Sequence, residues 1–237
     1  RSRGLGDVYK RQGITFLLSN INFVLVIFMK IQWLGHATFR IETNGKIIYI
    51  DPYVLPKNSP LADMILITHD HFDHLDTGKI GEIRKPGTIF LGNEKTVKSF
   101  REIMVIGYWE TRDFNGIKVT AVPGYNTGKR FHPKGDVSGF ILESEGKRIY
   151  HAGDTDLIPE MNSLEEIDVA LLPIGGTYTM DMEEAVRAAL IIRPKIIIPM
   201  HYNSLQGLEA DPAEFRKMLS ENSSIEMETA HPNGIEI

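Results

Sequence analysis

The run Thr-His-Asp-His-Phe-Asp-His at residues 68–74, rich in metal-binding side chains, directly follows the apolar segment Met-Ile-Leu-Ile at residues 64–67. The apolar segment predicts a strand, and side chains two residues apart on an extended chain point the same way. His69 and His71 are therefore expected to bind one cation. Asp73 and His74, in the turn that follows, are placed to reach a second. The spacing predicts half of a two-metal site, with a chance histidine cluster on a solvated loop as the alternative.

Four residues of this run resemble the HxHxDH signature of the metallo-β-lactamase-fold hydrolases: His69, His71, Asp73 and His74. Two later segments agree with that family pattern. Residues 148–155 (Arg-Ile-Tyr-His-Ala-Gly-Asp-Thr) correspond to the strand end that carries a bridging aspartate, and residues 196–201 (Ile-Ile-Ile-Pro-Met-His) to the one that carries the last histidine. The resemblance covers about residues 29 to 230, and it implies that Asp154 and His201 are metal ligands.

The same resemblance implies an α/β (α+β) fold, a four-layer αββα sandwich with two sheets back to back and helices on both outer faces. Residues 33–39 and 50–52 are similar to the opening of a small branch that includes ascorbate-6-phosphate lactonase-like and N-acyl phosphatidylethanolamine phospholipase D-like proteins. His36 in this opening is expected to orient a ligand or touch substrate, or else to be a satisfied core histidine. Asp51 is expected to support the ligands or to form a turn. His151 is expected to be buried and hydrogen-bonded behind the ligands, with a role as a ligand as the alternative.

One position departs from the family pattern. The resemblance places a further ligand histidine in a loop after a strand, where this chain has Asn126. An amide is a poor neutral ligand for zinc beside imidazoles. His132, six residues later in a Gly-rich loop, can span the difference, and we expect it to be the ligand. A site that lacks this ligand is the alternative, and Asn126 is then assigned to the substrate pocket or to the surroundings of the ligands.

The order of predicted elements is that of an α/β chain. An Asn-Gly pair at 44–45 predicts a tight hairpin. The predicted strands are 38–42, 46–50, 64–67, 116–122, 138–143, the segment at Arg148, 168–173 and 196–198. The predicted helices begin at capping residues and run from Asp76 to 85, from Asn93 to 104, from Asp181 to 193 and from Asp211 to 221.

Composition limits the possible functions. A chain of 237 residues with 42% hydrophobic content can bury one core, and nothing in it indicates two domains. The net charge of −5, with no long basic run, argues against a nucleic-acid partner. Cysteine is absent, which excludes disulfides and sulfur ligands, so a metal must be held by nitrogen and oxygen. We expect two divalent ions, with zinc first and manganese or ferrous iron as the alternatives.

The N-terminal residues differ from the rest. Residues 1–12 resemble translated sequencing-adaptor sequence, and residues 14–28 are apolar but shorter than the roughly 20 residues of a membrane span. A signal peptide is the alternative. We therefore expect residues 1–28 to be a non-native or untranslated extension, residues 29–237 to form the hydrolase domain, and the protein to be cytoplasmic without a membrane partner. His231 is expected in a surface turn.

The resemblance implies hydrolysis of a small molecule by a hydroxide that bridges two metals, with Asp73 orienting it and taking up its proton. Lactones, esters and phosphodiesters are the expected substrates, and a homo-oligomer is left open. A non-catalytic metal-binding or sensor protein is the alternative, suggested by Asn126. Five further residues near the expected ligands either hold an anion or are ordinary solvated loop residues: Tyr125, Lys129, Lys134, Tyr178 and Tyr202.

Overall fold

The computed structural model describes residues 29–229 and 233–237. The predictions made for residues 1–28 and for His231 lie outside the described residues. Within the described ranges, no helix is long and apolar enough to cross a membrane.

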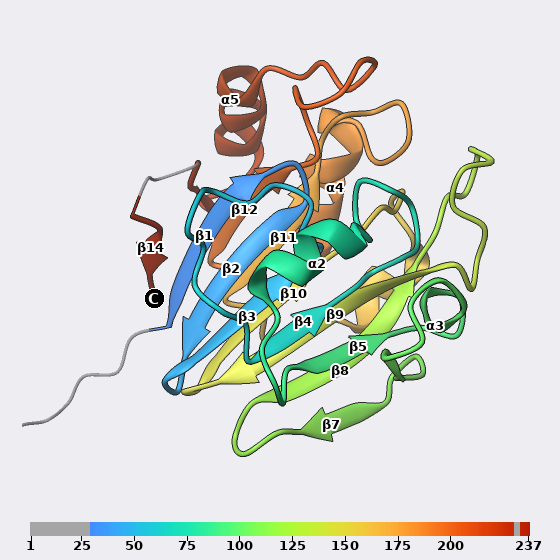
Figure 1. The fold of residues 1–237 in the computed structure, drawn as a ribbon. Coiled ribbons are helices and arrows are strands. Elements are labelled where there is room, and N and C mark those ends of the chain that lie inside the picture. The colour runs from blue at the N-terminus through green and yellow to red at the C-terminus, as the bar shows by residue number, and fades with distance from the viewer. Residues whose placement is uncertain (1–28, 230–232) are drawn as a thin grey trace, which may run out of the picture.

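Two seven-stranded sheets form the centre of the described structure (Figure 1). The first has the order β14-β1-β2-β3-β4-β5-β6 and the second the order β13-β12-β11-β10-β9-β8-β7. The strands of the first sheet are β1 (Lys30–Gly35), β2 (Thr38–Thr43), β3 (Lys46–Ile50), β4 (Met64–Leu66), β5 (Ile89–Gly92), β6 (Met104–Val105) and β14 (Ile235–Glu236). Those of the second are β7 (Thr111–Asp113), β8 (Lys118–Gly124), β9 (Val137–Ser144), β10 (Lys147–His151), β11 (Val169–Pro173), β12 (Ile196–Met200) and β13 (Glu226–Met227).

Helices cover the outer faces of the two sheets. They are α2 (Thr77–Ile83), α3 (Thr96–Ser99), the 3₁₀ helix η1 (Pro159–Ser163), α4 (Met182–Ile192) and α5 (Pro212–Asn222). Figure 1 shows α2 in front of the sheets and α4 behind them, and α4 packs against β11 and α5. The predicted αββα sandwich is confirmed.

Strand β4 shows why its sequence is apolar throughout. Met64 and Leu66 belong to the large core between the sheets, whereas Ile65 and the following Ile67 belong to a second cluster with Ile80 of α2. Successive side chains of a strand point to opposite faces, and here both faces are covered. An apolar strand buried on both faces has no side chain to offer to chemistry, so only its end can carry the site.

Most of the predicted turns and caps are confirmed. Asn44 and Gly45 join β2 to β3 with positive φ values of 50° and 68°, as a tight hairpin turn requires. Asp76 and Asp211 cap α2 and α5, and Asp181 forms a capping box at the start of α4.

The predicted helix from Asn93 through Met104 is wrong in its length. Asn93 does accept hydrogen bonds from the first turn, but α3 ends at Ser99. Phe100 is extended, and its ring packs edge-on against Phe90 of β5, while Met104 pairs with β5 in β6. Packing of Phe100 against the cluster that includes Ile80 of α2, together with the strand pairing of Met104, outweighs the local helix propensity.

The strands that precede the predicted ligands all end at one edge of the sandwich. Strands β3, β4 and β5 are parallel, and so are β10, β11 and β12. Because β8 and β10 are each antiparallel to β9, β8 runs in the direction of β10. The carboxyl ends of β4, β8, β10 and β12 thus bring four loops that are distant in sequence to the same place.

Candidate metal centre

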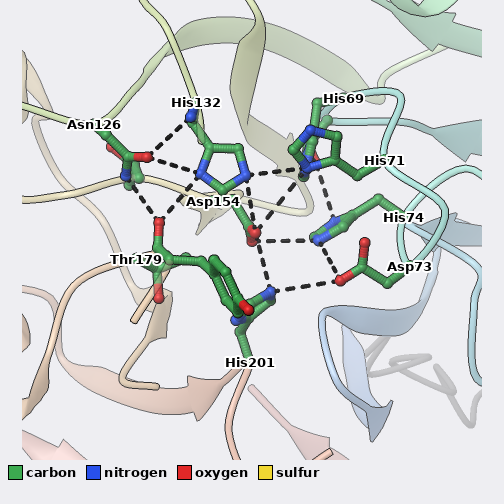
Figure 2. Close-up of polar contacts among 12 residues, drawn as sticks. His69, His71, Asp73, His74, Asn126, His132, Asp154, Thr179 and His201 are labelled. Carbon is green, nitrogen blue, oxygen red and sulfur yellow. Dashed lines mark hydrogen bonds and ion pairs between the residues drawn. The ribbon is translucent and has the colours of Figure 1, made fainter. Parts of the chain in front are cut away.

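Five imidazoles and two carboxylates meet at this edge. Figure 2 shows the rings of the histidines directed toward the carboxylate of Asp154, which lies in the middle of the group. The seven residues are those predicted as ligands: His69, His71, Asp73, His74, His132, Asp154 and His201.

One set of ligand atoms comes from three histidines. The Nδ1 atom of His71 lies 3.1 Å from His69 Nε2 and 3.2 Å from His132 Nε2. All three nitrogens lie within 4.8 Å of one another, close enough to share one cation. His69 and His71 thus act together across the spacing of two residues that the sequence indicated.

The second set lies beside it. Asp73, His74 and His201 form it together with His36, and their ligand atoms again lie within 4.8 Å of one another. His201 Nε2 and His74 Nε2 are each 3.9 Å from Asp73 Oδ2. A third group, His69, His74 and Asp154, joins the two sets, so the assignment of each ligand to one cation stays a prediction.

Asp154 lies between the two sets. Its Oδ1 atom is 3.3 Å from His74 Nε2, and its Oδ2 atom is 3.0 Å from His201 Nε2 and 3.4 Å from His132 Nε2. One carboxylate therefore faces ligands of both sets. It is also 2% exposed, so water cannot solvate this charge.

Several ligand atoms are buried without a hydrogen-bond partner among the described residues. They include His74 Nε2, His201 Nε2 and Asp154 Oδ1. Leaving such atoms unpaired costs about 1–3 kcal/mol each, unless another group satisfies them. Imidazole nitrogens and carboxylate oxygens are the donors that zinc, manganese and ferrous iron accept. The residues present thus fit divalent cations.

A buried carboxylate supports the HxHxDH run from behind. Asp51, which is fully buried, accepts hydrogen bonds from the backbone N–H and the hydroxyl of Thr68, at 2.8 and 2.7 Å. Its Oδ2 atom is also 2.7 Å from His74 Nδ1. The Thr68 hydroxyl lies 2.9 Å from His69 Nδ1. These contacts leave Nε2 of both histidines for the centre, and Asp51 supports the ligands instead of only forming a turn.

Asn126 orients His132. Its Oδ1 atom accepts a hydrogen bond from the backbone N–H of His132 at 2.9 Å and lies 3.1 Å from His132 Nδ1. Its amide nitrogen donates to Asp156 Oδ1 and to the carbonyl of Tyr178, both at 2.9 Å. An amide has two donors and two acceptor lone pairs, and all four are used here. Asn126 thus has no lone pair left for a metal, while His132 presents Nε2 to the centre.

The other two histidines differ in their relation to the centre. His36 Nε2 is 2.9 Å from Asp73 Oδ2, and His36 Nδ1 is 2.6 Å from the hydroxyl of Ser204. His151 is fully buried, where Nε2 contacts the carbonyl of Ala37 and Nδ1 accepts from the N–H of Gly153. His36 thus touches a predicted ligand, and His151 supports the backbone just before Asp154.

Three residues of the site have left-handed backbone conformations although none is glycine. The φ angles are 53° at His36, 47° at Asp51 and 56° at His201. Such conformations are uncommon for these residue types and persist where the surroundings hold them. The backbone N–H of His201 donates to the carbonyl of His36 at 3.0 Å, which ties two of these turns together.

The ionisation of the site suits metal binding. Burial lowers the pKa of His69 well below its usual value and that of His132 to about 4, so both are neutral at pH 7. Burial alone raises the pKa of Asp154, but the imidazoles of His201 and His74 outweigh it and hold that pKa well below the usual range. Neutral imidazoles beside an ionised carboxylate are the forms that bind a cation. His74 differs, because burial lowers its pKa but Asp154 and Asp51 outweigh burial and raise that pKa well above its usual value. A cation would have to displace this proton from His74.

A cleft of about 760 Å³ opens onto the centre. His71, Asp73, His132, Asp154 and His201 line its floor. Its walls are Phe72, Phe131, Tyr178, Leu205, Gln206 and Gly207. No lysine or arginine is among the lining residues in the part of the chain that the structure describes.

The prediction that five loop residues gather near the ligands is correct only for Tyr178, which lines the cleft. Lys129 donates to Asp156 and to the carbonyl of Thr179 instead. Lys134 and Tyr125 donate to Glu160, and Tyr202 stacks on Trp33. These groups are engaged within the protein and do not line the cleft.

Comparison with known proteins establishes the family. The β-lactamase superfamily domain matches residues 30–201. A UPF0173 metal-dependent hydrolase of Nanoarchaeum equitans is 40% identical over 205 residues, which cover 81% of this chain and 93% of that protein. One from Pyrococcus abyssi is 35% identical over 216 residues, covering 83% and 95%. The chain belongs to this family of metal-dependent hydrolases.

Solved structures agree with the UPF0173 assignment. A protein of Parabacteroides distasonis described as a metal-dependent hydrolase has a TM-score of 0.78 and 34% identity, covering 85% of this chain and 92% of the other. Igni18, a metallo hydrolase of Ignicoccus hospitalis, has a TM-score of 0.73 and 30% identity, covering 89% and 97%. The predicted superfamily is confirmed, while the narrower resemblance to lactonase-like and phospholipase-like proteins stays a prediction.

Sequence reasoning assigned no role to several residues that shape this UPF0173 site. Thr68 supports two histidines, Ser204 contacts His36, and Asp156 holds Asn126. The walls of the cleft were missed apart from Tyr178. One signal was available for Phe72 and Phe131. Each is a large apolar residue in a loop, next to a histidine predicted as a ligand, and each is exposed.

Proposed function

We propose that this UPF0173 hydrolase binds two divalent cations, with zinc as the expected metal, and cleaves an ester or lactone of a small molecule. The observation that carries the proposal is the position of the Asp154 carboxylate between two sets of ligand atoms, with distances of 3.0–3.4 Å to His74, His132 and His201.

The two sets suggest how the ligands are shared. His69, His71 and His132 would hold one cation, and Asp73, His74 and His201 would hold the other, with Asp154 between them. Two bound cations supply a nucleophile from water at neutral pH and polarise the scissile oxygen. The side chains of the protein would orient the water and bind the substrate.

Asp73 is the residue that we propose to orient the attacking water. Burial raises its pKa, but the hydrogen bond with His36 outweighs burial, and the pKa is about 2. The group is therefore a carboxylate at pH 7 and lies at the floor of the cleft. Oδ2 faces His36, His74 and His201, so it is the oxygen that would meet the cation. The other oxygen would be left to accept a hydrogen bond from the water and to take up its proton.

Apart from the charge that two bound cations would bring to the floor, the lining of the cleft favours a substrate with uncharged groups around the scissile bond. Enzymes that bind phosphate groups commonly use arginine or lysine to match the charge. The described lining of this cleft has neither. The alternative of a non-catalytic sensor protein rested on Asn126, and the contacts of Asn126 with His132 give that residue another role.

The test is a hydrolysis screen of neutral esters, lactones, thioesters and phosphodiesters, on protein loaded separately with zinc and with manganese. We expect two ions per chain and turnover of esters or lactones. Asp73→Ala is expected to lower turnover below about a tenth of the parent rate. Asp70→Ala is the matched control, because Asp70 lies in the same run but pairs with Ser99 and Lys95. One ion per chain, or full turnover by Asp73→Ala, would contradict the proposal.

A further inference from the structure

Four apolar or aromatic side chains surround the mouth of the cleft, and we name them the apolar rim: Phe72, Phe131, Tyr178 and Leu205. Phe72 is 69% exposed and Phe131 is 48% exposed. Each aromatic side chain carries a large apolar surface that is favourable to bury, so leaving it in water has a cost. Two such side chains beside one catalytic centre indicate a binding surface.

The rim is held in place by contacts within the protein. The ring of Phe131 packs edge-on against Tyr178, with centroids 4.7 Å apart, and Phe72 packs edge-on against Tyr53 at 6.1 Å. The segment that carries Leu205 is fixed at its ends by Asn203, which exchanges hydrogen bonds with the backbone of Ala210. A rim that is already ordered loses little entropy when a ligand binds.

Of the basic side chains nearest in sequence to the rim, Arg130 is exposed and does not line the cleft, and the two lysines are neutralised. Lys129 Nζ lies 2.8 Å from Asp156 Oδ1, and Lys134 Nζ lies 2.7 Å from Glu160 Oε1. Because no lysine or arginine lines the cleft among the described residues, an anionic group inside it would lose its hydration without a cationic side chain of the lining to replace it. The remaining polar wall residue is Gln206, which is uncharged.

We propose that the apolar rim binds an uncharged hydrophobic substituent of the substrate, an alkyl or aryl group attached to the scissile ester or lactone. This rests on the proposed function, because the carbonyl must lie at the floor beside Asp73 while the substituent extends along the rim. The volume of about 760 Å³ is in the range of small-molecule sites and leaves room for a group of this kind.

The first experiment measures kcat/KM for p-nitrophenyl esters with acyl chains from acetate to octanoate, on the zinc-loaded full chain. Burial of each added methylene is worth about 0.8 kcal/mol, which corresponds to a rise of at most about fourfold per methylene. We expect a two- to fourfold rise per methylene until the cleft is filled. Bis-p-nitrophenyl phosphate, an anionic substrate, is expected to be the poorer substrate. A flat series, or preference for the anion, overturns the proposal.

The second experiment uses variants. Phe131→Ala is expected to raise KM for the octanoate ester about fivefold, with little change for the acetate ester and an unchanged kcat. Leu190→Ala is the control, because Leu190 is 40% exposed on α4, away from the cleft, and its loss should change neither value. An equal effect of Phe131→Ala on both esters would show a structural disturbance and contradict the role of the rim.

A binding measurement separates the inference from the proposed hydrolysis. Calorimetric titration of the zinc-loaded protein with 2-butanone, 2-hexanone and 2-octanone uses neutral carbonyl compounds that cannot be hydrolysed. Affinity that grows with chain length and falls in Phe131→Ala supports the rim even if no ester is cleaved, in which case only the proposed function fails. Turnover of esters without any chain-length dependence of ketone binding overturns the rim and leaves the function. Self-association through the rim, seen as a dimer that Phe72→Ser dissolves, also overturns it.

Discussion

Exchange of the usual ligand histidine for Asn126 gives the sharpest prediction, because the structure assigns different tasks to Asn126 and His132. His132 is 2% exposed and directs Nε2 into the centre, whereas the side chain of Asn126 is fully hydrogen-bonded behind it. His132→Ala should remove a ligand. Asn126→Ala should leave the ligand present but poorly oriented.

The magnitudes differ accordingly. Loss of a group that orients a metal-binding histidine lowers metal affinity about 10- to 100-fold, or about 1.4–2.8 kcal/mol. Asn126→Ala also leaves the backbone N–H of His132 buried without its acceptor, which should cost about 1–3 kcal/mol of unfolding free energy. In His132→Ala one cation keeps only His69, His71 and Asp154, so its loss of affinity should exceed that of Asn126→Ala.

The assay is metal stoichiometry by mass spectrometry over a series of buffered free-zinc concentrations. The parent should keep two ions. Asn126→Ala should reach two ions at 10- to 100-fold higher free zinc, and His132→Ala should hold one ion where Asn126→Ala holds two. Thr127→Ala is the matched control, because Thr127 lies in the same loop and its hydroxyl makes only a long, weak contact with Asp156 Oδ2, at 3.4 Å. If His132→Ala keeps both ions and Asn126→Ala loses one, the assignment is refuted.

Three further predictions concern the scaffold. Gly175→Ala should weaken metal binding about tenfold, because a Cβ at this position would overlap the carbonyl oxygen of His201. Metal stoichiometry measures this effect, and unchanged affinity would contradict the close packing. Burial raises the pKa of Asp168, but Lys195 at 2.6 Å and a backbone N–H outweigh burial and lower it. The stabilisation of the folded protein by ionised Asp168 is therefore complete above the unfolded pKa of about 3.9 and is lost as pH falls through the lower pKa of the folded state. The thermal midpoints of the parent and Asp168→Ala should converge in acid, and a difference independent of pH would contradict this. Asp181→Ala should lower the unfolding free energy by about 1 kcal/mol in urea through loss of the α4 cap, and no change would show that the cap is dispensable.

Local chemistry explains the parts of the fold that the sequence predicted. A hairpin at Asn44-Gly45 depends only on the φ angles of two residues, and the capping box at the start of α4 depends on residues three apart. The division of the HxHxDH run into two sets follows from the direction of side chains along one short segment. These features need no knowledge of the rest of the chain.

Contacts between distant segments explain what was missed. The end of α3 at Ser99 depends on packing of Phe100 against a strand, which the sequence around it does not encode. The walls of the cleft come from separate loops that carry Phe72, Phe131 and Leu205. Nothing in a single sequence states which loops share an edge, so only the sheet topology brings these side chains together.

The Asn126 loop shows how a histidine six residues away from the usual family position can still reach the centre. The backbone N–H of Asn126 donates to the carbonyl of His132 at 2.8 Å, and the N–H of His132 donates to Asn126 Oδ1 at 2.9 Å. The two residues therefore lie opposite each other where the loop closes, although six positions separate them in sequence. An imidazole carried by either one would start from the same part of the loop. The requirement set by the centre is an imidazole at that point and an acceptor for its other nitrogen. In this chain His132 would supply the imidazole and Asn126 supplies the acceptor, one on each side of the loop.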